Sequence, residues 1–487
     1  MVDLEREIER LRTELRVRDE QLRVRDEVIM VQAAKITDLQ ARLEKLAQLV
    51  GEQGRKLGQH SGNSNLPPSS DGPGQGASSS QRKKKGGKRG GRKGHRGSHR
   101  RLVAPDEVDR VVDMFPARCD ACHQWLPKVL SLFPKRHQYT ELEPLVPKVT
   151  EYRRHEVCCP SCGHRTQAAY DDDVIPRTAF GPRLMAVVVL LTGVYHLSRR
   201  RAVRLLHDLL GLRISLGSIS NIERRMSAAV EPAVEEALEV VLDARVKHAD
   251  GTSWLERGVL LALWTVATAA ATVFAVLPDN RGKTLRHKLL RRSKGVLVSD
   301  RASALKFWVM RLRQICWAHL LRKFVGFSER DGPTGTLGRE LLDCTVVVFT
   351  YWSELKEGRL TRAQLQARIE PVRADFERTL RRAIDSELPG LSGSCADIWE
   401  HAEALWTFVD TPGVEPTNNH AEQELRGFVL WRKRSFGAQS EHGHRFAERL
   451  MTVAHTARKQ GRDILAFLVA CAERDAGGPA PSLFAAA

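Results

Sequence analysis

A seven-residue apolar repeat over the first fifty residues restricts the fold of this part of the chain more than any other pattern does. Alternating steps of four and three residues from Leu4 reach fourteen positions, of which eleven are aliphatic, and no Pro or Gly lies between them. A repeat of 3.5 residues keeps one stripe of a helix apolar, and a partner helix must cover that stripe. We therefore predict a coiled coil over residues 1–50 that joins copies of the chain. A lone helix packed on its own domain is the alternative.

Residues 51–102 are rich in Gly, Ser, Pro, Asn and basic residues. This composition buries too little apolar surface to fold alone, which predicts a flexible linker. Between Arg82 and Arg101 the linker holds 11 Lys or Arg in 20 residues and no acid, within a chain of formal net charge +18. Such a run favours DNA, because each neutralised phosphate releases bound counterions. A solubilising tail is the alternative. The residues expected to contact DNA here are Lys83, Lys84, Lys85, Arg89, Arg92 and Lys93.

The cysteines indicate a metal site rather than disulfide bonds. Their number, nine, is odd, and the charged first residues contain no export signal, so we expect a reduced, cytoplasmic protein. Four of them form two CxxC pairs, and two such pairs can complete a tetrahedral zinc site. We predict a small β-rich zinc module over residues 103–171, with a β-hairpin between the pairs that brings them together. The predicted ligands are Cys119, Cys122, Cys159 and Cys162, with Cys158, His123 and His164 as possible substitutes.

The apolar pattern changes between residue 178 and the C-terminus. Residues 178–245 have helical spacing, and the run that begins at Leu184 is too short to span a bilayer, so it predicts a buried helix. Residues 246–325 contain strand-length runs, namely RVKHAD, VLLALWTVATA, ATVFAVL, GVLVSD and QICWAH, and one helix-like stretch, KTLRHKLLRRS. Helical patterns return over residues 326–415 and 416–475. Together these patterns predict a multidomain α/β protein.

Within the first helical region, Leu197–Met226 has the pattern of a helix-turn-helix. Gly211 suits the end of the first helix, and Ser218 or Ser220 suits the start of the second. A second helix of this kind can lie in a major groove. Two helices that only pack together are the alternative. The residues of the second helix expected to contact DNA are Arg224 and Arg225.

Two aspartates follow apolar runs of strand length. Asp250 ends RVKHAD and Asp300 ends GVLVSD. A strand that is apolar up to a terminal Asp can hold that carboxylate at the rim of a rigid sheet. Two such aspartates and a third carboxylate from a helix can bind two Mg²⁺ ions for phosphodiester chemistry. Each Asp taken singly is also a common turn residue.

The third carboxylate is expected in the segment NNHAEQELRGFVLWRKRS. The helix predicted here carries Glu422 and Glu424, and the residue pattern leaves both open as the third ligand. Glu422 and Arg426 are also spaced as a surface ion pair. The basic-aromatic patch that follows suits the phosphates flanking a cleavage site. The residues of this segment expected to contact DNA are Arg426, Arg432 and Lys433.

Several specific motifs occur in a fixed order. They are SNLPPSSD and GHRG in the linker, the CxxC and CPxC pairs, ADGTSW, VSDRASAL, CWAHLLRKF, and NNHAEQELR followed by WRKRSFG. In this order they resemble the transposases of the insertion sequence 66 family over nearly the whole chain. The most specific are CWAH with the following RKF, and NNxAE with the following RK.

The resemblance implies an RNase H-like catalytic domain of the DDE superfamily. Its catalytic residues, Asp250, Asp300 and Glu422, would bind Mg²⁺ or Mn²⁺, and the family frame favours Glu422 over Glu424. A helical insertion at about 320–415 would account for the long interval between the second Asp and the Glu. Residues expected near the site are His319, Asn418 and Asn419, with Cys316, Arg322 and Lys323.

The activity that the resemblance implies is metal-dependent cleavage and strand transfer at the terminal inverted repeats of an insertion sequence. The implied partners are double-stranded DNA, further copies of the chain and companion proteins of the same element. The implied location is the bacterial cytoplasm, at the nucleoid. A catalytically inactive DNA-binding regulator and an RNase H-type nuclease without transfer activity are the alternatives.

Overall fold

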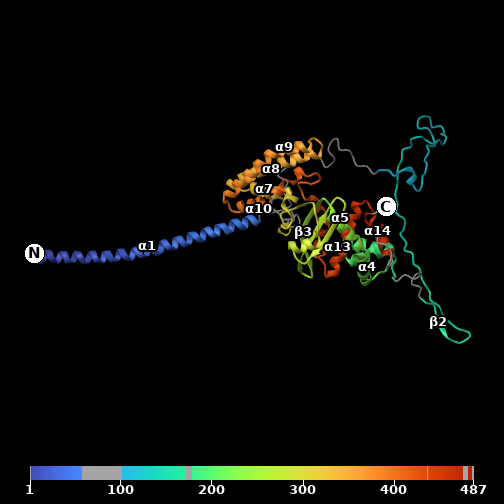
Figure 1. Cartoon of the computed structure of the whole chain (residues 1–487), viewed down its shortest axis with the longest axis horizontal. Helices are drawn as coiled ribbons and strands as arrows, with labels where there is room; N and C mark the ends of the chain where they lie inside the picture. The colour runs from blue at the N-terminus through green and yellow to red at the C-terminus, as the bar shows by residue number, and fades with distance from the viewer. Residues whose placement is uncertain (1, 58–100, 170–177, 436, 475–480, 485–487) are drawn as a thin grey trace. The chain divides into compact units, whose positions relative to one another are not determined.

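The computed structural model describes residues 2–57, 101–169, 178–435, 437–474 and 481–484 (Figure 1). The basic residues from Lys83 to Lys93 lie outside these ranges, so their DNA contacts stay a prediction. Contacts divide the chain into two compact units. The first comprises Met1–Ser78, Pro182–His196 and Glu223–Ala487, and the second Ser79–Gly181 and Leu197–Ile222. In the described ranges, no helix has both the length and the apolar content to cross a membrane.

One mixed five-stranded sheet forms the centre of the first unit. Its strands are β3 (Val246–Glu256), β4 (Val259–Ala267), β5 (Thr272–Leu277), β6 (Val296–Ser299) and β7 (Arg313–Ile315). Their order is β5-β4-β3-β6-β7, with β3, β4 and β5 antiparallel and with β6 and β7 parallel to β3. The turn between β3 and β4 has φ of 49° at Arg257 and 83° at Gly258, as a two-residue hairpin requires. The α/β part of the predicted fold class is thus confirmed.

Two predictions about strand ends are wrong. Strand β3 does not stop at Asp250, because its antiparallel partner β4 continues the pairing to Glu256. What ends near Asp250 is the parallel pairing with β6, whose last partner on β3 is His248. Of QICWAH, only the first two residues are strand, since helix α7 begins at Trp317.

Helices α12 (Asn419–Ser435) and α13 (Glu441–Lys459) pack on the antiparallel part of the sheet. The buried side chains between them include Trp254, Phe274, Phe428 and Met451. Side chains of helix α13 also accept hydrogen bonds from backbone N–H groups along the edge of β5. The hydroxyls of Thr452 and Thr456 accept hydrogen bonds from the backbone N–H groups of Phe274 (3.1 Å) and Thr272 (3.2 Å), and Glu448 accepts from that of Val276. Four helical residues rise about 6 Å and two strand residues about 6.8 Å, so the two rows of partners match.

A helical insertion follows β7. It comprises α7 (Trp317–Ser328), α8 (Gly332–Lys356), α9 (Arg362–Asp385), α10 (Ser392–Trp399), the 3-10 turn η6 (Ala402–Leu405) and α11 (Thr407–Asp410). Helix α8 packs between α7 and α9, and α10 packs on α9 (Figure 1). The core of the insertion continues into the sheet, because Val298 and Ile315 belong to the same apolar cluster as Trp317, Phe376 and Trp406. The insertion is therefore fixed to the part of the sheet that carries Asp300.

The other helices of the first unit are α2 (Pro182–Val189) with the π-helical turn η3 (Leu190–Val194), α5 (Glu231–Asp243), α6 (Gly282–Lys288) and α14 (Ile464–Glu473). Helix α2 is buried at Met185, Val188 and Val189, as predicted for the run from Leu184. It packs against α14, while α5 packs on α13 and β5. Short 3-10 turns, η4 (Ser303–Leu305) and η5 (Met310–Leu312), connect β6 to β7.

The predicted helix-turn-helix contains α3 (Arg199–Leu210) and α4 (Leu216–Ala229). Gly211 ends α3 with φ of 64°, as predicted. The predicted caps of the second helix are wrong, because α4 begins earlier and the hydroxyl of Ser215 accepts the N–H of Ser218 (3.0 Å). The side chains of Arg224 and Arg225 are exposed on α4.

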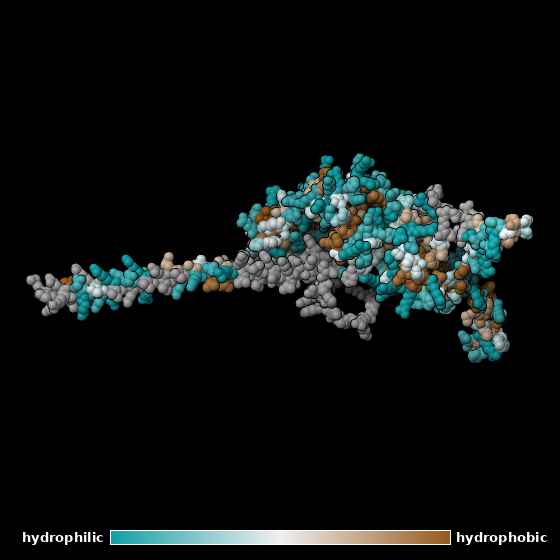
Figure 2. All heavy atoms as spheres, turned by 90° about the horizontal axis from the view of Figure 1, so that it is seen from below, coloured by the Kyte–Doolittle hydropathy of each residue, from teal (hydrophilic) through white to brown (hydrophobic). Residues whose placement is uncertain are grey.

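Helix α1 (Val2–Leu57) is a single helix that ends seven residues beyond the predicted coiled coil. Its described seam residues are exposed, from 43% at Ile8 to 65% at Leu15 and 66% at Leu43. Figure 2 shows apolar side chains exposed among hydrophilic ones along its described part. Self-association stays a prediction, and this exposed apolar stripe is the surface that it would cover.

We expect Leu15→Asp to weaken self-association strongly, because one charge per chain would be buried in the seam of each assembly. The matched control is Thr13→Asp, two residues away and off the seam, which should leave the assembly unchanged. Sedimentation velocity of the full chain measures both. A wild-type protein that is monomeric at all concentrations would contradict the coiled coil.

Candidate active site

The sheet register brings Asp250 and Asp300 together. His248 of β3 pairs with Val298 of the parallel strand β6. Each aspartate comes two residues after its member of this pair, and residues two apart on a strand point to the same face. Asp250 therefore lies on the same face of β3 as His248, and Asp300 follows the end of β6 at the same level of the neighbouring strand.

A glycine after Asp250 leaves room for the ring of Trp264 on the neighbouring strand. Gly251 pairs with Trp264 of β4, and a Cβ at position 251 would lie 2.8 Å from the Trp264 ring. The backbone N–H of Gly251 donates to the Asp250 carboxylate (2.9 Å). Trp264 is itself buried and donates to Asn280 (2.9 Å), so it packs on the face of β3 opposite the Asp250 carboxylate and supports the strand there.

Three carboxylates share one environment at this point. Burial and the negative charges of Asp300 and Glu422 together raise the pKa of Asp250 to about 8, although the Gly251 N–H and the charge of Arg322 act in the opposite direction. Asp250, Asp300 and Glu422 are therefore near enough to interact electrostatically. At Asp250 the effect of the two neighbouring carboxylates outweighs that of Arg322, and a bound divalent cation would relieve this repulsion.

Hydrogen bonds from neighbouring groups hold the loop that carries Asp300. The backbone N–H of Ala302 donates to the Asp300 carboxylate (2.9 Å). Arg313 of β7, which is fully buried, donates to the carbonyl of Asp300 (3.0 Å) and to the hydroxyl of Ser299 (3.1 Å). The carboxylate thus stands on a fixed backbone.

Glu422 lies in the first turn of α12, and Asn418 attaches this turn to the sheet. The buried side-chain amide of Asn418 donates to the carbonyl of Ala249 (2.8 Å), the residue before Asp250. Its backbone N–H donates to the Cys316 sulfur (3.2 Å), and its carbonyl accepts the N–H of Glu422 (3.2 Å). Of the two asparagines predicted near the site, Asn418 makes these contacts, while Asn419 is exposed.

His319 and Arg322 of α7 flank Glu422. The His319 Nδ1 atom lies 3.6 Å and the Arg322 Nη2 atom 3.7 Å from the same carboxylate oxygen, Oε1. Burial lowers the pKa of His319, and the charge of Arg322 lowers it further. At neutral pH, Arg322 is therefore the cation beside Glu422, and His319 is a neutral ring.

Glu424 points to the other side of α12, as its spacing from Glu422 predicts. It forms ion pairs with Lys459 (3.0 Å) and, when their rings are protonated, with His420 (3.6 Å) and His455. Although burial alone would raise it, the hydrogen bonds from both histidines and the charge of Lys459 hold the pKa of Glu424 far below its usual range. Glu424 is thus a compensated structural anion between α12 and α13.

Sequence patterns did not indicate two buried polar residues near the carboxylates, namely Arg313 and His248. His248 is buried, and its ring lies 5.0 Å from that of His420, measured between centroids. Burial, together with the charge of His420, lowers its pKa to about 4, so the ring is neutral at pH 7. The available signal for His248 was its place two residues before Asp250, which puts both on one strand face.

The residues predicted to contact DNA near this site differ in their surroundings. The side chains of Arg426 and Lys433 are exposed. Arg432 instead turns toward β3, where it donates to the hydroxyls of Thr252 (3.1 Å) and Ser253 (2.6 Å). Arg432 therefore ties the end of α12 to the strand that carries Asp250.

The two CxxC loops adopt the same turn. His123 N–H donates to the carbonyl of Cys119, and Gly163 N–H donates to that of Cys159, both at 2.9 Å. Backbone N–H groups of Cys122 and Ala121 lower the pKa of the Cys119 thiol, and those of Ser161 and Cys162 lower that of Cys159. Such hydrogen bonds favour the thiolate form that binds metal.

The hairpin predicted between the two loops is wrong. Strands β1 (Glu156–Cys158) and β2 (Arg165–Gln167) enclose the second loop, a bridge from Arg118 to Trp125 encloses the first, and residues 126–155, all described, form no strand. Each loop is itself the turn of a short antiparallel pair, so the strands form around the loops. The four sulfurs are not among the described side chains gathered within 4.8 Å of one another, and the zinc site stays a prediction.

We expect Cys122→Ser to lose one tightly bound zinc ion per chain and to make residues 103–169 sensitive to protease. The reason is that so few side chains are buried here that metal coordination would supply the folding free energy, roughly 10–16 kcal/mol for structural zinc. Cys344→Ser, which removes a half-buried cysteine of α8, is the control. Zinc content by mass spectrometry decides, and equal content in the two variants would contradict the module.

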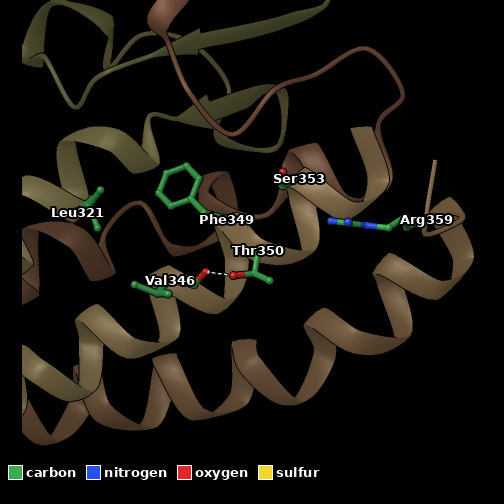
Figure 3. Close-up of a pocket in the computed structure, with 6 residues that line it drawn as sticks. All are labelled: Leu321, Val346, Phe349, Thr350, Ser353 and Arg359. Atoms are coloured by element: carbon green, nitrogen blue, oxygen red, sulfur yellow. Dashed lines mark hydrogen bonds between the residues drawn. The ribbon is translucent and has the colours of Figure 1, made fainter. Parts of the chain in front are cut away.

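A separate pocket lies on the insertion, between α7 and α8 (Figure 3). Its lining residues are Leu321, Val346, Phe349, Thr350, Ser353 and Arg359. The Thr350 hydroxyl donates to the carbonyl of Val346 (2.9 Å), so it is already satisfied. The lining includes no acid and no metal ligand of the soft type, which separates this pocket from the carboxylate site.

Comparison with known proteins links this geometry to a family. The model described as "Transposase IS66 family" matches residues 177–445, more than half of the chain, including all three carboxylates. A second model, of a family of unknown function, matches residues 4–101. The chain is also similar to the uncharacterised protein y4hP of Sinorhizobium fredii, with 23% identity over 419 residues that cover 78% of this chain and 75% of the relative.

Proposed function

Because this chain belongs to the transposase IS66 family, we propose that it cleaves the ends of its own insertion sequence and transfers them to target DNA. The observation that carries the proposal is the electrostatic coupling of Asp250, Asp300 and Glu422 beside the central strand β3 and the end of β6. Carboxylates from two parallel strands and a helix converge here although 172 positions separate the first from the last in numbering. Membership of the family supports DNA as the substrate.

The residues present fit a divalent cation. Three carboxylates supply hard oxygen ligands, and the buried Oε1 atom of Glu422 has no hydrogen-bond partner within the described ranges. We propose that Asp250, Asp300 and Glu422 hold Mg²⁺ or Mn²⁺. When bound, such ions activate the attacking oxygen and stabilise the leaving oxygen of a phosphodiester.

The chain's own groups would orient the DNA around this site. Arg322 lies beside Glu422, and the exposed Arg426 and Lys433 follow it on α12, so each can face a phosphate. The Gly251 N–H holds the Asp250 carboxylate, and the Ala302 N–H and Arg313 hold the loop that carries Asp300. The coiled coil would bring two DNA ends into one assembly, and the basic linker and the zinc module would add phosphate contacts.

The test uses purified full-length protein, Mg²⁺ or Mn²⁺, and DNA that contains the ends of the element. We expect nicking at the ends and joining of the 3′-hydroxyl to target DNA, both reduced by about a thousandfold or more in Asp300→Asn. Asp385→Asn, an exposed aspartate at the end of α9, is the control and should cleave normally. Absence of wild-type cleavage at every metal concentration would favour an inactive DNA-binding regulator, and cleavage without joining would favour a nuclease.

A further inference from the structure

The geometry points to a second cation site, formed by Cys316, His319 and Glu422, that binds a thiophilic ion such as Zn²⁺ and competes for Glu422 with the three-carboxylate set. Among the described residues, this is the group of Cys, His and acidic side chains whose ligand atoms all lie within 4.8 Å of one another. Cation binding here is independent of the proposed function. Its effect on DNA cleavage rests on that function.

The starts of two helices create the site. Cys316 is the residue before α7 and His319 lies in its first turn, where the His319 N–H donates to the Cys316 carbonyl (3.2 Å). This C-x-x-H turn puts sulfur and imidazole on one side of the helix start. Glu422 comes from the first turn of α12, and the two turns are joined where Trp317 N–H donates to the carbonyl of Pro416 (2.8 Å).

The spacing of the donor atoms suits one small ion. The His319 Nδ1 atom and the Glu422 Oε1 atom are 3.6 Å apart. Around a tetrahedral zinc ion, with metal–ligand bonds of about 2.0–2.3 Å, neighbouring donor atoms lie roughly 3.3–3.8 Å apart. The sulfur is within 4.8 Å of both, so a small side-chain adjustment completes three ligands and leaves a fourth position for water.

Two of the three donor atoms have unsatisfied hydrogen-bonding capacity. The His319 Nδ1 and Glu422 Oε1 atoms are buried and have no hydrogen-bond partner among the residues that the structure describes. Burying such atoms without a partner is unfavourable, and a bound ion would satisfy both. The Cys316 sulfur accepts the backbone N–H of Asn418 (3.2 Å), as thiolate ligands commonly do in metal sites.

The donor types decide which ion is preferred. Sulfur and imidazole nitrogen favour Zn²⁺ or Co²⁺, whereas Mg²⁺ prefers six oxygen ligands and keeps several waters. Glu422 is the one residue shared by the two sets. When it binds the thiophilic ion, the Mg²⁺ set retains only Asp250 and Asp300, so zinc should inhibit Mg²⁺-dependent cleavage.

The binding test uses the full chain and Co²⁺ as a spectroscopic probe. We expect wild type to bind one more Co²⁺ per chain than either Cys316→Ser or His319→Asn. Cys316→Ser should also show less thiolate-to-cobalt absorption than wild type. Cys344→Ser is the matched cysteine control and should resemble wild type in this difference. Equal cobalt stoichiometry in wild type, Cys316→Ser and His319→Asn would overturn the site.

The functional arm measures DNA cleavage at saturating Mg²⁺ with and without micromolar Zn²⁺, each variant relative to its own zinc-free rate. Zinc should inhibit wild type and Cys344→Ser, and at least about tenfold more zinc should be needed in Cys316→Ser. Equal sensitivity would overturn the competition. Asp300→Asn should lose cleavage yet keep the cobalt signal, so a failure of the proposed function is distinguishable from a failure of this site.

Discussion

Asp250→Asn is expected to abolish DNA cleavage and, at the same time, to raise the melting temperature of the metal-free protein at pH 8. The loss of activity should be about a thousandfold or more, because the amide removes a charged metal ligand. The gain in stability follows from the pKa of Asp250, which burial and the charges of Asp300 and Glu422 raise from 3.8 to about 8.

The direction of this stability change follows from the difference in proton binding between the folded and the unfolded state. The folded state binds the Asp250 proton more tightly than the unfolded chain does, so the associated stability is fully present below pH 3.8 and is lost as pH rises to about 8. An asparagine does not ionise, and the variant should therefore gain most over wild type at pH 8 and little near pH 4. Thermal unfolding in a chelating buffer across this range measures the difference, with Asp385→Asn as the control. A lower melting temperature for Asp250→Asn at pH 8 would contradict the shared carboxylate environment.

The effect of Mg²⁺ on thermal stability provides a second test of the same variant. In wild type the cation must displace the Asp250 proton, so its stabilising effect should be larger at pH 8 than at pH 5.5. Asp250→Asn should lose most of this Mg²⁺ effect at both pH values. An unchanged Mg²⁺ effect in the variant would place the cation elsewhere.

Substitution of two glutamates only two residues apart should have opposite consequences. Glu422→Gln is expected to lose cleavage by about a thousandfold or more while keeping its stability, since it removes one of three mutually repelling charges. Glu424→Gln is expected to lose about 3 kcal/mol of unfolding free energy, because the partly buried Lys459 and two histidines lose their anion. When folded, it should still cleave DNA.

Urea unfolding and cleavage assays on both variants test this pair of outcomes. The lowered pKa of Glu424 adds stability above its ordinary pKa of 4.5 that is lost as pH falls below it. The Glu424→Gln difference should therefore shrink in acid. A folded Glu424→Gln protein without activity, together with an active Glu422→Gln protein, would show that Glu424 rather than Glu422 is the third carboxylate.

Local patterns predicted much of the secondary structure around the site. GVLVSD predicts a buried strand followed by an acid because five consecutive apolar or small residues precede Asp300, and β6 covers Val296–Ser299. The same reasoning placed the end of strand β3 too early, at Asp250. Its pairing partner β4, which lies later in the chain, extends β3 to Glu256. It also predicted a hairpin between the CxxC loops, although the alternating residues there have no packed face to bury.

The sequence by itself determined the family, the helical and strand periods and the residue types that can bind metal or phosphate, since these depend on neighbours along the chain. Only the tertiary structure decided that Asp250 and Asp300 stand at one level of parallel strands, that Glu422 faces them while Glu424 faces Lys459, and that Cys316 and His319 adjoin Glu422. The physical reason is that burial, charge coupling and ligand spacing depend on distances between residues far apart in the chain. Those distances exist only after the sheet and helices α7, α12 and α13 have packed.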